Sequence, residues 1–261
     1  MPDPAALLPR LVEIAAAAGA RVMEVRSRPH VTGTKDDGSP LTEADIASEQ
    51  VIAAGLARVA PDVAVVSEED LSKPPPPPGV PFVLVDPLDG TREFLGATGE
   101  FTVNIALLIG NRPACGVVYA PAIGRIWTGV KGTGAATGEL TPGQDPAAIA
   151  WRPIRARPRP SQGLVAVASR SHSDATTETF LMRLGVSERR SMGSSIKFCL
   201  VAEGLADVYP RFGETFEWDT AAGQAVLEAA GGKVETPEGA PFAYGKAPTF
   251  RNGPFIAWGA E

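Results

Sequence analysis

The sequence predicts a layered α/β or α+β fold, and three observations lead to this prediction. Stretches with helical periodicity and short apolar stretches typical of buried strands mix along the whole chain, without an internal repeat. The 261 residues are enough for one large domain or two small ones with a buried core. Hydrophobic residues make up 44% of the chain, which is ordinary for a globular protein.

The first half of the chain begins with a predicted helix. Its apolar residues form one helical stripe: Leu7, Leu11, Ile14, Ala18, Val22 and Val25. A polar loop or hairpin follows at residues 31–41, and a second helix is expected from Thr42 onward. The strands predicted in this half comprise residues 63–66, 82–85, 101–109, 113–120 and 125–130. A run of five prolines at residues 74–78 is typical of a stiff polyproline spacer.

The second half is separated from the first by residues 133–161, which are rich in Gly, Pro and Arg. We expect loops there with a domain boundary near their end, so that the chain divides into units of residues 1–158 and 159–261. A strand is then predicted at residues 164–168. Helices are predicted at residues 176–184, 195–202 and 220–230, and Gly231 and Gly232 stop the last of them.

Charge and composition narrow the function classes. The 30 acidic residues outnumber the 24 basic ones, and the net charge of −6 argues against binding to a nucleic-acid polymer. No run of 18 apolar residues is present, so no integral membrane segment is expected. The two cysteines, Cys115 and Cys199, lack the spacing of a zinc or redox motif, and a reducing cytoplasmic compartment is expected.

Two acidic residues lie on a tight corner directly after the strand predicted at residues 82–85. Asp86 and Asp89 flank a proline turn, and Gly90 lets the backbone approach a ligand closely. Thr91 is expected to open a helix whose free N–H groups suit a phosphate. The same residues also have an ordinary structural interpretation, because Asp-Gly is a common turn pair.

Glu68 and Glu69 close the strand before that one. If the two strands are parallel neighbours, these acids converge with Asp86 and Asp89 at the carboxyl edge of the sheet, where ligands of open α/β sheets gather. Crowded carboxylates repel one another and require a cation or a shared proton. Ligands that are all oxygen favour Mg²⁺ over Zn²⁺, and two such ions about 3.5–4 Å apart suit phosphoryl transfer. The alternative is that Glu68 and Glu69 form a solvated strand end.

Two further acidic residues also allow two interpretations. Thr42-x-x-Asp45 matches a helix capping box, and Asp219 before Thr220 could be a helix N-cap. Other motifs of phosphate chemistry do not match. The Asp-x-x-Asp spacing differs from the Asp-x-Asp of haloacid-dehalogenase-type phosphatases, and the sequence has neither a P-loop nor a nucleophile elbow.

Taken together, three motifs resemble the signature of the inositol monophosphatase superfamily. They are Ser67-Glu68-Glu69, Val85-Asp86-Pro87-Leu88-Asp89-Gly90-Thr91 with Glu93-Phe94, and Glu217-Trp218-Asp219-Thr220-Ala221-Ala222. They occur in the family's order and span nearly the whole chain. Within the superfamily the chain looks most like the CysQ-type 3'(2'),5'-bisphosphate nucleotidases. Four stretches carry this finer resemblance: Asp37-Gly38-Ser39-Pro40 with Thr42-Glu43-Ala44-Asp45, Gly99-Glu100-Phe101-Thr102-Val103-Asn104, Ser169-Arg170-Ser171-His172, and Gly193-Ser194-Ser195-Ile196-Lys197-Phe198-Cys199.

The resemblance implies a two-domain α-β-α-β-α sandwich with the active site between the halves. It also implies Mg²⁺, as two or three ions. The implied metal ligands are Glu68, Asp86, Asp89, Asp219 and the carbonyl group of Leu88, with Glu69 supporting them or holding a further ion. Asp45 and Thr91 would position and deprotonate the attacking water. The amides of Gly90 and Thr91 would bind the scissile phosphate.

The implied substrate is adenosine 3',5'-bisphosphate, cleaved to AMP and phosphate, with inhibition by lithium and sodium. Its sulfated form, 3'-phosphoadenylyl sulfate, is a second candidate. The residues implied for the rest of the nucleotide are Ser169, His172, Ser194, Lys197 and Arg211. Without the resemblance, His172 is as readily a surface histidine as a binding residue, and Lys197 is interpreted as a solvated helix position. Arg92, where the family commonly has Lys, and the proline run depart from the family pattern.

Two alternatives stay open at this point. An inositol or sugar phosphate phosphatase would use the same metal chemistry with a different pocket. A non-catalytic nucleotide- or metal-binding protein would not need Asp45 and Thr91. A monomer or a homodimer in the cytoplasm is expected, with peripheral attachment to the inner membrane as an alternative location.

Overall fold

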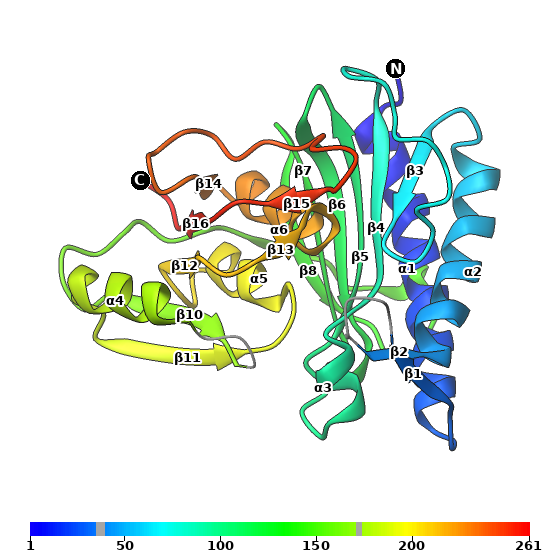
Figure 1. Ribbon diagram of the computed structural model, residues 1–261, viewed down its shortest axis with the longest axis horizontal. Helices are drawn as coiled ribbons and strands as arrows, with labels where there is room; N and C mark the ends of the chain where they lie inside the picture. The colour runs from blue at the N-terminus through cyan, green and yellow to red at the C-terminus, as the bar shows by residue number, and fades with distance from the viewer. Residues whose placement is uncertain (35–39, 171–173) are drawn as a thin grey trace.

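The computed structural model describes residues 1–34, 40–170 and 174–261, and its layers are those that the sequence predicts (Figure 1). Two long helices cover one face of a seven-stranded sheet. Two shorter helices lie on its other face, between it and a five-stranded sheet, and a last helix covers the outer face of that smaller sheet. The order of layers is therefore α-β-α-β-α, as expected.

The outer layer consists of α1 (Pro4–Arg26) and α2 (Glu43–Val59). Every residue of the predicted apolar stripe in α1 is buried against the large sheet or α2, so the stripe is confirmed. The hairpin interpretation of residues 31–41 is also confirmed, because β1 (Thr32–Thr34) pairs with β2 (Pro40–Thr42) in antiparallel fashion. The Asp37-Gly38-Ser39 part of the nucleotidase-like stretch lies outside the described residues.

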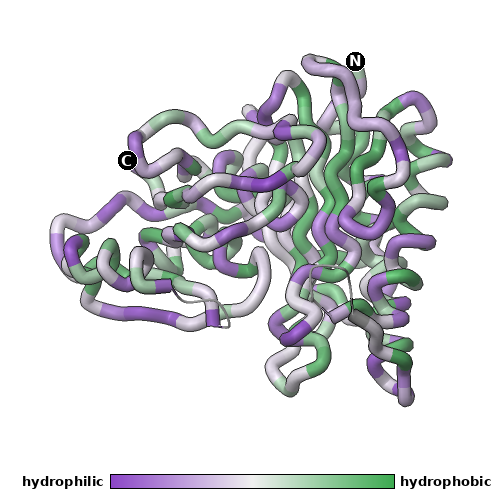
Figure 2. Tube along the Cα trace, in the orientation of Figure 1, coloured by the Kyte–Doolittle hydropathy of each residue, from purple (hydrophilic) through white to green (hydrophobic). Residues whose placement is uncertain are grey.

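The large sheet has the strand order β3-β4-β5-β6-β7-β8-β9. Its strands are β3 (Ala64–Ser67), β4 (Phe82–Asp89), β5 (Thr102–Ile109), β6 (Arg112–Ala120), β7 (Arg125–Val130), β8 (Gly134–Glu139) and β9 (Arg152–Ile154). β3 and β4 are parallel, whereas each later neighbouring pair is antiparallel. Figure 2 shows that hydrophobic residues dominate the central strands, as expected for a sheet covered on both faces.

The middle layer is formed by α5 (Ile196–Ala202) and α6 (Glu217–Ala229). α6 lies unusually close to the large sheet, because a Cβ atom on Gly129 of β7 would be only 2.6 Å from the carbonyl oxygen of Ala225. One hydrophobic cluster joins Trp127 of β7 to Phe198 of α5 and to Phe255 of the small sheet. The two predicted units, residues 1–158 and 159–261, therefore share a core, and the division between them stays a prediction.

The small sheet has the strand order β11-β10-β12-β16-β14. Its strands are β10 (Val165–Ser169), β11 (Glu188–Met192), β12 (Val208–Arg211), β14 (Lys233–Glu235) and β16 (Phe255–Trp258). α4 (Ala175–Leu184) covers its outer face through Leu181. The remaining elements are α3 (Thr91–Leu95), η1 (Pro121–Ile123), η2 (Pro146–Ala148), β13 (Thr215–Phe216) and β15 (Arg251–Asn252). In the described part of the chain, no helix is both long enough and apolar enough to cross a membrane.

The structure corrects two expectations about secondary structure. Residues 133–161 are not all loop, because β8 and β9 extend the large sheet; pairing with β7 there overrides the weak strand propensity of Gly and Ala. The helix predicted at residues 220–230 begins earlier, at Glu217. The four strands of the small sheet after residue 186, namely β11, β12, β14 and β16, have no counterpart among the predicted elements, because they are short and, in β11, highly charged.

Candidate active site

An irregularity in β4 directs two acidic side chains to the same face of the large sheet. In the pairing with β5, Asp86 lies opposite Asn104, and Asp89 lies opposite Thr102. The two β5 residues are two positions apart and therefore face the same side of the sheet. The two aspartates are three positions apart, so β4 contains one extra residue, and this bulge brings both aspartates to one face.

Glu68 follows β3 at the same edge of the sheet. Ser67 lies opposite Val85 in the parallel pairing, and the backbone N–H of Glu68 donates to the carbonyl oxygen of Val85 at 3.2 Å. The parallel arrangement on which the predicted convergence depends is therefore present. Asp86 is buried, and its carboxylate accepts a hydrogen bond from the N–H of Leu88 at 3.0 Å, which fixes the proline turn.

Asp89 is held from both halves of the chain. Its Oδ2 atom accepts a hydrogen bond from the N–H of Ser195 at 2.6 Å. Thr102 Oγ1 and Asn104 Nδ2, both on β5, lie 3.5 and 3.4 Å from the same oxygen. The Ser195 hydroxyl donates in turn to Asn104 Oδ1 at 2.7 Å. These contacts fix the orientation of the Asp89 carboxylate.

Asp219 lies in the first turn of α6. Asp219 is not the N-cap residue of α6, because it is the third residue within the helix. Its Oδ2 atom accepts a hydrogen bond from the N–H of Phe216, the residue that precedes the helix, at 2.7 Å. The carboxylate therefore still stabilises the start of α6, and it does so from within the first turn.

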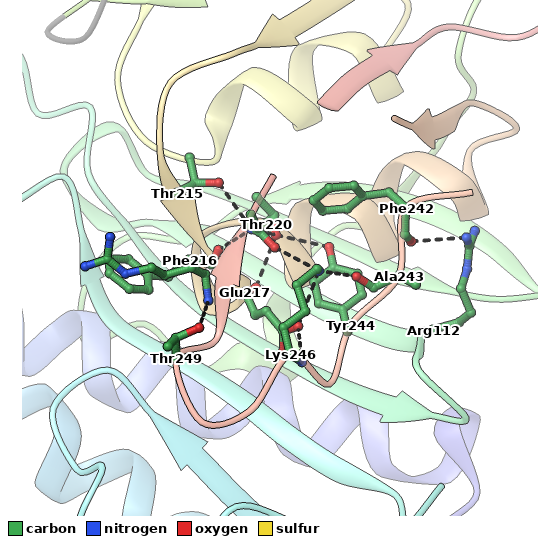
Figure 3. A network of polar contacts seen from close by, with 12 residues as sticks. Arg112, Thr215, Phe216, Glu217, Thr220, Phe242, Ala243, Tyr244, Lys246 and Thr249 are labelled. Carbon is green, nitrogen blue, oxygen red and sulfur yellow. Dashed lines mark hydrogen bonds and ion pairs between the residues drawn. The ribbon is translucent and has the colours of Figure 1, made fainter. Parts of the chain in front are cut away.

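A network of polar contacts from the C-terminal segment supports this turn (Figure 3). Glu217 is fully buried, and its Oε1 atom accepts from the backbone N–H and from Nζ of Lys246 at 2.9 and 3.4 Å. Nζ of Lys246 also donates to Asn252 Oδ1 at 3.1 Å. Asn252 Nδ2 then donates to the carbonyl oxygen of Phe216 at 2.6 Å and to Thr220 Oγ1 at 3.0 Å. The position of Asp219 is thus determined by contacts from more than one segment.

Asp45 and Thr91 lie next to each other, although they come from different helices. The Oδ2 atom of buried Asp45 accepts from the N–H and the hydroxyl of Thr42 at 2.7 and 2.6 Å, so the capping box is confirmed. Its Oδ1 atom lies 3.5 Å from Thr91 Oγ1, which lies 3.4 Å from the carbonyl oxygen of Leu88. One carboxylate therefore caps α2 and faces the Thr91 hydroxyl.

Gly90 adopts a backbone conformation that requires glycine. Its φ angle is +92°, in the left-handed region. A Cβ atom would lie 3.2 Å from the Glu93 carboxylate and 3.3 Å from the carbonyl oxygen of Glu100. Thr91 opens α3, as expected, although this helix has only 5 residues.

A cavity of about 670 Å³ brings together most of the predicted site residues. From the first half of the chain it is lined by Glu68, Asp89, Gly90 and Thr91, and from the second half by Ser169, Ser194, Lys197, Arg211 and Asp219. The remaining predicted residues do not line it: Asp45, Asp86 and Leu88 are buried, and Glu69 is partly exposed. His172 lies outside the described residues.

Two cationic side chains from the second half are largely desolvated in this cavity. Lys197 is 5% exposed, so its interpretation as a solvated helix position is wrong. Its ammonium group donates to the carbonyl oxygens of Met192, at 3.4 Å, and of Ser194, and burial lowers its pKa to about 8. Arg211 is 9% exposed and donates to the carbonyl oxygen of Glu214 at 3.1 Å. An acidic chain thus concentrates positive charge beside its acidic cluster.

Several residues that line the cavity were not among the predicted site residues, and Asp174, Tyr209 and Phe216 are examples. The ring of Phe216 stacks on that of Trp218, with centroids 4.9 Å apart and planes 7° from parallel. Phe216 directly precedes the motif that contains Asp219, so its place in the sequence could have indicated that it lies at the site. Tyr209 lies in a short strand that the sequence pattern does not reveal.

The acidic residues of the cavity fit a hard divalent metal ion. Burial, together with the nearby charges of Glu68 and Glu93, raises the pKa of Asp89 to about 6, although Lys197 and the N–H of Ser195 act in the opposite direction. Burial and the charges of Asp89 and Glu68 raise the pKa of Asp219 well above its ordinary value. A bound cation relieves this repulsion. Asp86, Asp89 and Asp219 each accept a hydrogen bond from a backbone N–H, and such hydrogen bonds commonly orient the side chains that bind a metal ion.

These donors do not form a finished coordination shell. Among the described residues, no group of three or more Asp, Glu, His or Cys side chains is arranged as a bound ion requires. The fit to a metal therefore depends on the all-oxygen chemistry of the donors and on their mutual repulsion, and it favours Mg²⁺-like ions over Zn²⁺.

Comparison with known proteins agrees with this chemistry. The model of the inositol monophosphatase family matches residues 3–252. The chain is 42% identical to the 3'(2'),5'-bisphosphate nucleotidase CysQ of Shigella flexneri and 41% identical to that of Escherichia coli K12, in each case over 94% of this chain and 97% of the relative. Its structure resembles that of CysQ from Bacteroides thetaiotaomicron, with a TM-score of 0.80 at 35% identity over 99% of this chain and 98% of that one. An inositol monophosphatase from Anabaena gives a TM-score of 0.74 at 26% identity, over 100% and 92% of the two chains.

Proposed function

The chain belongs to the inositol monophosphatase family, and from that premise we propose that it is a metal-dependent 3'(2'),5'-bisphosphate nucleotidase. The proposed reaction is hydrolysis of adenosine 3',5'-bisphosphate to AMP and phosphate. One observation carries the proposal: a single cavity is lined both by the acids Glu68, Asp89 and Asp219 and by the buried cations Lys197 and Arg211. A bisphosphate has two anionic groups, and this cavity offers a different environment for each.

The proposed metal is Mg²⁺, as two or three ions held by five groups. These groups are the side chains of Glu68, Asp86, Asp89 and Asp219 and the carbonyl of Leu88, with Glu69 supporting them. When bound, such ions supply Lewis acidity and lower the pKa of water. The all-oxygen donor set and the raised pKa values of Asp89 and Asp219 support this assignment.

The residues around the metal ligands have separate roles in the proposed mechanism. Thr91 orients the attacking water in line with the phosphorus atom, and the water would give a proton to the Thr91 oxygen as the Thr91 hydroxyl gives its own proton to Asp45. The backbone amides of Gly90 and Thr91 bind the phosphate that is transferred to water. No covalent enzyme intermediate is expected.

The second half of the chain binds the rest of the nucleotide in this proposal. Lys197 and Arg211 bind the retained 5'-phosphate, and the planar guanidinium of Arg211 suits a bidentate contact. Ser169 and Ser194 also line the cavity, and His172 is proposed to join them. The same pocket accommodates 3'-phosphoadenylyl sulfate as a second substrate.

The proposal is tested by comparing phosphate release in the presence of Mg²⁺ from three substrates, with and without lithium. Adenosine 3',5'-bisphosphate should be preferred over inositol 1-phosphate and fructose 1,6-bisphosphate, and lithium should inhibit its hydrolysis. Lys197→Met should then impair the bisphosphate nucleotide more than inositol 1-phosphate, because only the nucleotide needs the second anionic site. Preference for a sugar phosphate, or equal losses in the variant, would instead indicate an inositol or sugar phosphate phosphatase. Tight nucleotide binding without phosphate release would indicate a binding protein.

A further inference from the structure

Glu100 joins the large sheet to two segments of the small sheet. It lies two residues before β5, in the first half of the chain. Its Oε1 atom accepts from Nη2 of Arg170 at 2.8 Å, and its Oε2 atom accepts from Nε of Arg170 at 3.1 Å and from the N–H of Gly193 at 2.7 Å. Arg170 donates in addition to the carbonyl oxygen of Ser191 at 2.9 Å. One carboxylate thus accepts three hydrogen bonds from the second half of the chain.

The environment of this contact makes it stronger than an ordinary surface ion pair. The Glu100 side chain is only 14% exposed, whereas Arg170 is 44% exposed. Bidentate hydrogen bonds between a guanidinium and a carboxylate are charge-assisted and geometrically specific. A desolvated carboxylate that loses these donors is costly to keep in place.

Arg170 and Gly193 directly follow two neighbouring strands. β10 and β11 are parallel, with Ser169 opposite Met192, so both strands end at the same edge of the small sheet. Ser169 and Ser194, which adjoin the residues that Glu100 contacts, line the cavity. Glu100 therefore contacts the residues that follow both strand ends.

The turn at residues 193–195 has little freedom to move. A Cβ atom on Gly193 would lie 2.6 Å from the carbonyl oxygen of Glu100, so the two segments are in close contact. Ser194 has a φ angle of +48°, which is unusual for a residue with a side chain. Ser195 then donates its N–H to Asp89. The turn is consequently attached to the first half at each end, at Glu100 and at Asp89.

We propose that Glu100, acting with Arg170, is a positioning residue that gives the site its selectivity for bisphosphate nucleotides. The inference depends on the function proposed above. Neither residue lines the cavity, so the proposed effect of both is indirect. Their effect is to hold Ser169, Ser194 and Lys197 at a fixed distance from Asp89, so that both anionic groups of the substrate are bound at once.

The test combines two measurements on the full-length protein and the variant Glu100→Gln. The first is amide hydrogen exchange of residues 190–197, which reports on the turn whatever the substrate is. The second is kcat and KM for adenosine 3',5'-bisphosphate and for 4-nitrophenyl phosphate, a monoester that needs only the acidic side of the cavity. We expect about tenfold faster exchange in this segment and an about tenfold higher KM for the nucleotide. For 4-nitrophenyl phosphate, kcat/KM should change by less than about twofold. Arg170→Met should act in the same direction.

A matched control is available within the second half of the chain. Arg157 makes bidentate contacts of 2.7 and 2.7 Å with Asp207, and neither residue lines the cavity. Asp207→Asn should lower the melting temperature without altering the selectivity between the two substrates. If Glu100→Gln impairs both substrates equally, or leaves the exchange of residues 190–197 unchanged, the inference is overturned.

The two proposals fail in different ways. A wild-type protein that does not prefer the nucleotide refutes the proposed function, and the selectivity part of the inference with it. Hydrogen exchange then still decides whether Glu100 positions the turn at residues 193–195: faster exchange in the variant supports that role, and unchanged exchange contradicts it.

Discussion

The carboxylate of Asp89 accepts a hydrogen bond from the backbone N–H of Ser195 at 2.6 Å, although these residues lie 106 positions apart in the sequence. Asp89 ends β4, and Ser195 directly precedes α5. The Ser195 hydroxyl also contacts Thr102 and Asn104 of β5 at 2.9 and 2.7 Å. The proposed metal site and the proposed nucleotide pocket therefore share one wall, in which Asp89 and Ser195 are in direct contact.

The variant Asp89→Asn should lose metal-dependent hydrolysis but not stability. An amide lacks the negative charge with which the carboxylate binds a divalent ion, so kcat should fall at least about a hundredfold. The folded metal-free protein should be no less stable, because burial already raises the pKa of this carboxyl group and the amide oxygen can still accept from Ser195. Turnover at several Mg²⁺ concentrations and a melting curve in EDTA measure the two effects. Asp62→Asn, at an exposed position, is the control; normal Mg²⁺-dependent turnover in Asp89→Asn would refute the proposed site.

Thr91→Val should affect kcat more than KM. In the proposed mechanism the hydroxyl of Thr91 connects Asp45 to the attacking water, so its loss should lower kcat about a hundredfold and change KM by less than about threefold. Thr91→Ser keeps the hydroxyl and should retain most of the activity. Steady-state kinetics of both variants with the same substrate decide the matter. A large rise in KM at unchanged kcat would mean that Thr91 only binds the substrate.

Local sequence patterns predicted the features that depend on neighbouring residues. The stripe from Leu7 to Val25 revealed the buried face of α1, and Thr42 with Asp45 revealed the start of α2, because helix periodicity and capping are local. The start of α6 was placed too late, since Asp219 caps it from within the first turn.

The long-range features of the site could not be predicted in the same way. The contacts of Glu100 with Arg170 and Gly193 span 70 and 93 residues, and no pattern within one element encodes them. The burial of Lys197 could not be predicted locally either. The sequence around it permits a solvated helix position, and only the packing between the two sheets buries its side chain. The resemblance to a family supplied its proposed role, which the residues alone did not.

Lys246→Met should destabilise the protein by about 3 kcal/mol, because it leaves the fully buried carboxylate of Glu217 without its cation. Combining it with Glu217→Gln should recover part of this loss, since the double variant contains no unpaired buried charge. Urea unfolding of the single and double variants measures both values. The control is Lys233→Met, which removes exposed ion pairs with Glu235 and Glu261 and should cost less than about 1 kcal/mol. A loss in Lys246→Met as small as in the control would contradict this role for the network in Figure 3.

The contact between Asp207 and Arg157 should make the stability of the protein depend on pH in the acidic range. Burial alone would raise the pKa of Asp207, but hydrogen bonds from the Arg157 guanidinium and from the N–H of Val165 outweigh it and hold the pKa below its ordinary value of 3.8. The unfolded chain therefore binds this proton more readily than the folded protein. The stabilisation is complete above pH 3.8 and is lost as the pH falls from there through the lower folded-state pKa.

Asp207→Asn removes this contribution. Its free energy of unfolding at neutral pH should be about 1–3 kcal/mol lower than that of the wild type, because a charge-assisted contact with a fully buried carboxylate is lost. The difference between the two proteins should shrink as the pH falls below 3.8, since the wild type then loses the same contact by protonation. Urea unfolding at a series of pH values measures this difference directly. A difference that stays constant across the acidic range would mean that the charge of Asp207 contributes nothing and that the substitution acts through packing alone.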